Sequence, residues 1–141
     1  MPKPVSRGFS QHDASVPQAR TFVHRLLSEW QMLDRADEVL LCVSELATNA
    51  AKHGTSAGGR YLVKVSADEG RLRVEVHDLS RRRPRVQNPE ECDANGRGLL
   101  LVDALADEWG VEPRVPRGKV VWTEFKIEMR EQYAAAQAAQ C

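Results

Sequence analysis

The sequence predicts an α+β fold, a two-layer α/β sandwich in which helices cover one face of a mixed, mostly antiparallel sheet. Two long segments with apolar residues at helical spacing come first. Two extended runs joined by a short turn follow, and a third helix with two more extended runs completes the order. The chain has 141 residues, of which 42% are hydrophobic, and it has no internal repeat. This length and composition are typical of one globular domain that needs no disulfide scaffold.

Two helices are expected in the first half of the chain. The first begins at Ser15, which can cap a helix, with Pro17 in the first turn and Gln18 three residues after the serine. Its apolar stripe consists of Ala19, Phe22, Val23, Leu26, Leu27 and Trp30. The second helix runs over about Asp37–His53 and is stopped by Gly54. The apolar face of the second helix contains Val39, Val43, Leu46 and Ala50.

Four extended runs are expected to form the sheet. Arg60–Ala67 and Arg71–Asp78 are joined by a turn short enough to make them a hairpin. Asp107–Val111 and Gly118–Glu128 form a second pair of strands. A third helix begins near Gly98, between the two pairs.

The segment from Leu79 to about Asn95 has no periodicity and is rich in Arg, Pro, Asn and acidic residues. It is too long for an ordinary connection, so we interpret it as a candidate functional flap. We expect residues 15–128 to form the domain. Residues 1–14 would be an N-terminal extension able to supply an edge strand, and the Ala- and Gln-rich residues 129–141 a mobile tail.

The charge of the chain argues against dedicated nucleic-acid binding. Twenty Lys and Arg residues balance twenty Asp and Glu residues, so there is no global basic field to attract phosphates. The basic run Arg81–Arg85 has no interleaved aromatic residue. A solvated loop or a contact with a partner protein explains this run more simply.

The cysteines and the N-terminus favour a cytoplasmic location. Cys42, Cys92 and Cys141 are odd in number and lack metal-ligand spacing, which indicates a reducing compartment. Because Cys42 is flanked by Leu41 and Val43, we interpret it as a packed apolar residue and not a redox sensor. We find neither the apolar core of a signal peptide nor a stretch approaching the roughly 18 apolar residues of a membrane span.

Three polar residues of the second helix fall on one side of it. Glu45, Asn49 and Lys52 form a ridge that we expect opposite the apolar face. A solvated helix face accounts for the Glu and the Lys. Asn49 is different, because asparagine is a poor helix former within Leu46–Ala51. A carboxylate one turn from an amide oxygen can supply a general base and an oxygen ligand for Mg²⁺.

A carboxylate also ends the second extended run. Within Arg71–Asp78, Leu72, Val74 and Val76 alternate toward the core, and Asp78 falls in the same phase. An unpaired buried carboxylate is costly. Asp78 is therefore either a turn residue just past the edge of the sheet or held by a specific donor.

Two glycines precede the third helix. Gly96 and Gly98 flank Arg97, and their backbone would let free N–H groups converge on a phosphate. A flexible hinge before a helix explains the same residues. The motif alone does not decide between these interpretations.

In their order, these segments resemble the GHKL ATP-binding superfamily, named for gyrase, the heat-shock chaperone, histidine kinases and mismatch-repair ATPases. Within it they are most similar to the bacterial anti-sigma factor serine/threonine kinases. Ser44–Gly54 resembles the N-box of that branch, Val74–Asp78 its adenine-reading strand and Gly96–Leu99 its second glycine box. Trp109–Val111 and Gly118–Trp122 resemble the closing hairpin. The resemblance covers nearly the whole chain and implies the Bergerat fold of GHKL ATPases.

The resemblance implies ATP and Mg²⁺ as ligands. It makes Glu45 the general base, Asn49 the Mg²⁺ ligand and Asp78 the acceptor for the adenine amino group. The other ATP-binding residues that it implies are Lys52, His53, Gly96, Arg97, Gly98 and Leu99. The segment from Ser80 to Asn95 would be the ATP lid.

Three positions depart from the family pattern. Ser80 replaces the usual glycine after the adenine strand, and Ala94 stands where sporulation-type sigma-factor kinases often place an Arg. Val120 stands where relatives often carry Thr, which removes a possible polar contact near the base. We expect nucleotide binding to tolerate these changes better than kinase activity does.

The resemblance implies a bacterial transcription regulator that sequesters a sigma factor. It would phosphorylate a Ser or Thr of an antagonist protein of the STAS type in a partner switch. The alternative is a non-catalytic ATP-binding module that acts through its surfaces. Glu45 favours the kinase, and Ala94 and Val120 favour the module. Homodimerisation is implied by family analogy, and no direct contact with nucleic acid or a membrane is expected.

Overall fold

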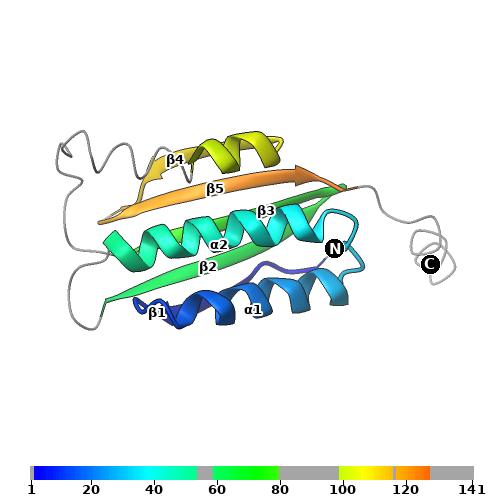
Figure 1. The fold of residues 1–141 in the computed structure, drawn as a ribbon. Coiled ribbons are helices and arrows are strands. Elements are labelled where there is room, and N and C mark those ends of the chain that lie inside the picture. Colours follow the sequence, from blue (N-terminus) through cyan, green and yellow to red (C-terminus); the bar gives the residue numbers. More distant parts are fainter. Residues whose placement is uncertain (1, 54–58, 80–98, 116, 128–141) are drawn as a thin grey trace, which may run out of the picture.

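Helices cover one face of a five-stranded sheet in the computed structural model, which describes residues 2–53, 59–79, 99–115 and 117–127 (Figure 1). The strands lie in the order β1-β2-β3-β5-β4. Their bounds are β1 Val5–Ser10, β2 Arg60–Asp68, β3 Arg71–Asp78, β4 Glu108–Pro113 and β5 Lys119–Lys126. Every pairing among these strands is antiparallel. The expected sandwich is confirmed, without the parallel pairing that a mixed sheet would contain.

The two long helices begin and end close to where the periodicity predicts. They are α1 Ser15–Glu29 and α2 Ala36–His53, and residues 99–105 are also helical. The expected capping role of Ser15 is wrong, because Ala14 is the cap residue and makes no side-chain capping bond. The hydroxyl of Ser15 is instead buried and hydrogen bonded to the Tyr61 hydroxyl at 2.7 Å. This bond joins the start of α1 to β2.

The hydrophobic core lies between the helices and the sheet. Alternate residues of β2 and β3 face the helices, and the fully buried ones include Val63, Val65, Leu72 and Val74. Cys42 of α2 is 1% exposed within this core, and burial raises the pKa of its thiol to about 11, with the nearby carboxylate of Glu38 adding to the shift. The thiol is therefore packed and protonated at neutral pH.

Arg35, just before α2, connects several elements at one end of the sandwich. Its guanidinium contacts the carboxylates of Glu38 and Asp107, the backbone carbonyls of Leu105 and Lys126, and the ring of Phe125. The Asp107 carboxylate also accepts the backbone N–H of Lys126 at 2.6 Å. This bond, with the Arg35 guanidinium, lowers the pKa of Asp107. We call this set of contacts the Arg35 clamp.

The face of the sheet away from the helices carries a network of charged side chains. Arg73 of β3 contacts Glu124 of β5 at 2.8 Å and Glu75 of its own strand at 3.1 Å. The guanidinium of Arg73 also lies 4.5 Å from the centre of the Trp122 ring. His77 continues the network, with its Nε2 at 2.9 Å from a Glu75 oxygen. These contacts join β3 to β5 from the side opposite the core.

Several expected features lie outside the described residues. They are Gly54, the lid from Ser80 to Asn95, Cys92, Cys141 and the tail 129–141. Among the helices that the structure describes, none has the length and apolar character needed to cross a membrane.

Candidate nucleotide-binding site

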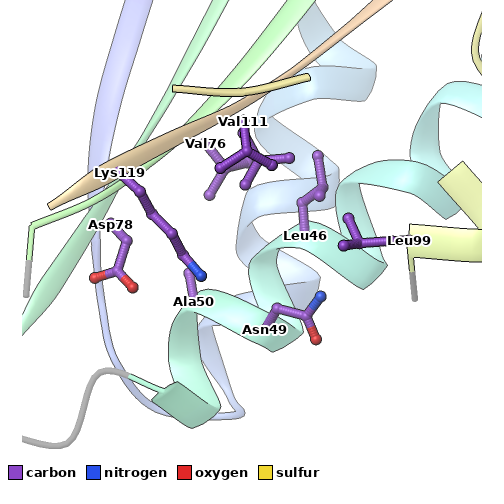
Figure 2. A pocket seen from close by; sticks show the side chains of 9 residues that line it. Leu46, Asn49, Ala50, Val76, Asp78, Leu99, Val111 and Lys119 are labelled. Atoms are coloured by element: carbon purple, nitrogen blue, oxygen red, sulfur yellow. The ribbon is translucent and has the colours of Figure 1, made fainter. Parts of the chain in front are cut away.

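A pocket lies between α2 and the sheet, at the end where β3 finishes and β5 begins (Figure 2). Among the residues that the structure describes, most of those lining the pocket are apolar, and three, Asn49, Asp78 and Lys119, are polar. The apolar lining residues are Leu46, Ala50, Val76, Leu99, Val111 and Val121. Apolar walls with a few converging polar groups are typical of a small-molecule site.

Asp78 supplies a buried carboxylate to this pocket. Asp78 is 6% exposed and lies on the same face of β3 as Val76, as the sequence predicts. Asp78 pairs with Tyr61 on one side and with Lys119 on the other, so it is the last residue of a central strand. Of the two interpretations left open by the sequence, a turn residue beyond the sheet is therefore wrong.

Asn49 reaches the pocket from α2. It is half-buried and lines the same wall as Leu46, which lies one turn earlier in the helix. The expectation that the polar ridge lies opposite the apolar face is wrong for this residue. Residues three apart on a helix are neighbours, so the Asn49 side chain lies at the flank of the core face.

Lys119 is the third polar residue of the pocket, and the sequence motifs did not include it. In Figure 2 its side chain extends from the start of β5 toward Ala50 of α2. Lys119 lies two and four residues before Val121 and Thr123, so it shares with them the helix-facing side of β5. The alternation of β5 alone could have indicated this orientation, but only the pairing with β3 places the lysine beside Asp78.

The turn before Lys119 is held against the end of β3. Gly118 has a φ of +90°, and a Cβ at this position would lie 2.0 Å from the Asp78 carbonyl oxygen. The backbone N–H of Arg114 donates to the Gly118 carbonyl at 2.9 Å. The Arg114 Nε donates to His77 Nδ1 at 3.2 Å, so Nε2 carries the hydrogen that Glu75 accepts. Contacts on both faces of the sheet therefore position the residues beside Asp78.

The structure brings together only part of the predicted site. Asn49, Asp78 and Leu99 line one pocket. Glu45 is half-buried and Lys52 is exposed on α2, and neither is among the residues lining the pocket. His53 is the last residue of α2, and its side chain is not among those that the structure describes. Gly96, Arg97 and Gly98 lie outside the described residues, as do Ser80 and Ala94.

The expected effect of Val120 on a contact near the base is wrong. Val120 pairs with His77 and Glu112 on the face of the sheet away from the helices. It is not among the pocket-lining residues, whereas its neighbours Lys119 and Val121 are. A strand exposes successive side chains on opposite faces, so a shift of one position moves a residue out of the site.

Among the described residues near the pocket, few side chains can bind a metal ion. Within the described ranges there is no group of three or more His, Cys, Asp or Glu side chains able to hold a metal ion. The Asn49 amide is the oxygen donor that α2 offers to the pocket. Such a site suits an ion that keeps several water and phosphate ligands, as Mg²⁺ does.

The antiparallel sheet, the helices on one face and the pocket between α2 and the sheet define the class of histidine kinase-like ATPases. The family described as the histidine kinase-like ATPase domain matches residues 9–125, and the chain belongs to this family. The resemblance to the GHKL superfamily that the motifs indicate is thereby confirmed.

A curated relative is the anti-sigma F factor of Geobacillus thermodenitrificans (strain NG80-2). The two proteins are 27% identical over 105 residues, which cover 67% of this chain and 72% of the relative.

Solved structures of the same fold belong to larger proteins. The chain of the RsbU and RsbW domains of Rv1364c from Mycobacterium tuberculosis matches with a TM-score of 0.69 and 16% identity, over 92% of this chain and 34% of that one. Full-length ShkA in complex with AMPPNP matches with a TM-score of 0.55 and 19% identity, over 84% of this chain and 30% of that one. The chain thus spans about a third of each, and at these identities the likeness concerns the fold.

Proposed function

We propose that this protein binds ATP with Mg²⁺ in the pocket beside Asp78 and acts as a regulator of the anti-sigma factor type. The observation that carries the proposal is a buried carboxylate, Asp78, in an apolar pocket that also receives the Asn49 amide. The membership in the ATPase family and the similarity to an anti-sigma F factor support it.

The pocket residues fit an adenine nucleotide. The side chains of Leu46, Val76 and Val121 offer apolar surfaces to a base, and the Asp78 carboxylate is an acceptor for its amino group. A hydrogen bond from the amino group of the ligand to this buried carboxylate favours binding of the base that carries the amino group.

Asn49 is the residue that we propose as the Mg²⁺ ligand. When bound, the ion would neutralise part of the negative charge of the phosphates. We propose that the same phosphates are contacted by Lys52, His53 and the segment Gly96–Leu99. Of these residues, Leu99 lines the pocket.

The proposed reaction is transfer of the terminal phosphoryl group of ATP to a serine or threonine hydroxyl of an antagonist protein, which leaves ADP. Glu45, one turn before Asn49 on α2, would accept the hydroxyl proton. The proposed partners are a sigma factor and an antagonist of the STAS type. We also propose that the protein forms a homodimer and is located in the cytoplasm.

A second candidate function is a nucleotide-binding interaction module without phosphoryl transfer. The position of Glu45 favours it, since this half-buried residue is not among those lining the pocket. In this case ATP would act as a conformational ligand, and the protein would act by binding its partners.

A paired measurement on wild type and Glu45→Ala separates the two functions. If the protein is a kinase, Glu45→Ala keeps ATP affinity within a few-fold and lowers phosphorylation of the antagonist by roughly 10²- to 10⁴-fold. Glu112→Ala, an exposed change in β4, is the control and should leave both values unchanged. Wild-type protein that captures its partner and binds ATP, yet transfers no phosphate, would instead establish the interaction module.

A further inference from the structure

Lys119 places a cation beside the carboxylate that we assign to the base. The two residues are directly opposite each other in the antiparallel pairing of β3 with β5. Both line the pocket, and Figure 2 shows the lysine side chain extending along it toward α2. The Lys119 ammonium is therefore positioned to meet whatever group the Asp78 carboxylate meets.

The backbone fixes this arrangement. The close approach of Gly118 to the Asp78 carbonyl leaves no room for a side chain at position 118, so the start of β5 lies tightly against the end of β3. The bond from the Arg114 backbone N–H to the Gly118 carbonyl closes the turn. Lys119 thus enters the pocket from a rigid strand end and not from a free loop.

The two side chains have opposite hydrogen-bonding roles. An ionised carboxylate only accepts hydrogen bonds, and an ammonium group only donates them. Side by side, Asp78 and Lys119 complement a ligand edge on which a donor lies next to an acceptor. Adenine has such an edge, because its 6-amino group is flanked by the ring nitrogens N1 and N7, both of which accept.

We propose that Lys119 is a specificity-determining residue that donates a hydrogen bond to a ring nitrogen flanking the 6-amino group of adenine. This inference rests on the proposed binding of ATP with Asp78 at the amino group. It adds a second point of recognition, so that the base is read by a pair of adjacent groups on β3 and β5. A lysine acting by general attraction to phosphates would not distinguish between bases.

The test combines a lysine variant with purine analogues in isothermal titration calorimetry. Wild type and Lys119→Met are titrated with ADP, with 1-deaza-ADP and with 7-deaza-ADP, in which one ring nitrogen is replaced by carbon. We expect Lys119→Met to weaken ADP binding about tenfold. One of the two deaza analogues should bind wild type about as weakly as ADP binds the variant. Lys119→Met should not weaken the binding of that analogue any further. Which analogue does so identifies the nitrogen.

Controls separate this role from a general effect of charge or fold. Lys126→Met removes a lysine at the exposed far end of the same strand and should leave ADP affinity unchanged. Lys119→Met should unfold at the same temperature as wild type, and Lys119→Gln, which keeps a donor, should recover part of the affinity.

Three results would overturn the proposal. The first is unchanged ADP binding in Lys119→Met, and the second is a loss by the same factor for all three nucleotides. The third is weaker binding of ADP with unchanged binding of adenosine, which would assign the lysine to the phosphates. Wild-type protein that binds no ADP at all would instead contradict the proposed function itself.

Discussion

The two ends of the sheet use polar side chains differently. At one end, the Arg35 clamp joins α2, β5 and the segment after the third helix, and its charged groups contact one another and backbone carbonyls. At the other end, Asn49, Asp78 and Lys119 line a pocket. Polar groups of the first kind hold the fold together, and groups of the second kind line the pocket in which we propose that a ligand binds. Substitutions at the two ends should therefore separate stability from binding.

The largest expected effect is on stability, from Arg35→Ala. Because the change removes several hydrogen bonds and leaves Asp107 without its cation, we expect the free energy of unfolding to fall by about 2 to 4 kcal/mol. Urea denaturation measures it. Arg71→Ala, whose side chain is 55% exposed and 3.8 Å from Glu124, is the control and should cost less than about 0.5 kcal/mol. Equal losses for the two variants would contradict the role of the clamp.

The next effect is on binding, from Asn49→Ala. If the amide holds the metal, ATP affinity measured with Mg²⁺ should fall to the value measured in EDTA. Stability should stay the same or rise by about 0.5 kcal/mol, since alanine is the better helix former. Thr48→Ala, a change at the neighbouring residue outside the pocket lining, should keep the Mg²⁺ dependence. An unchanged Mg-ATP affinity in Asn49→Ala would refute the ligand assignment.

A smaller effect concerns acid stability and Glu75. Burial alone would raise the pKa of this carboxyl, but hydrogen bonds from His77 and Arg73 outweigh it, and the pKa is lowered. A lowered pKa stabilises the fold above the ordinary value of 4.5, and this stability is lost as the pH falls through the folded value. Glu75→Gln should therefore cost about 1 kcal/mol at pH 7.

The check is urea denaturation of wild type and Glu75→Gln at pH 7 and near pH 3, where the difference between them should shrink. Glu112→Gln, an exposed change in β4, should track wild type at both values. A difference that is constant with pH would mean that the charge of Glu75 does not contribute.

Periodicity in the sequence predicted the elements well and the contacts between them poorly. The helical spacing located α2 to within one residue of its start, and the alternation of β3 placed Asp78 on the core side. The Arg35 clamp was not predictable, because its partners include backbone carbonyls 70 and 91 residues away. Lys119 was missed because its place beside Asp78 depends on the register between β3 and β5.

The most direct test of the pocket as an adenine site is calorimetry of ATP and GTP on wild type and Asp78→Asn. Guanine has no amino group at the position where Asp78 would accept one, so wild type should prefer ATP. The variant, which loses the charge of the acceptor, should bind ATP about tenfold more weakly, with a reduced preference over GTP. Circular dichroism would check that it remains folded. If Asp78→Asn leaves both affinities as they are in wild type, the pocket beside Asp78 is not where adenine is recognised.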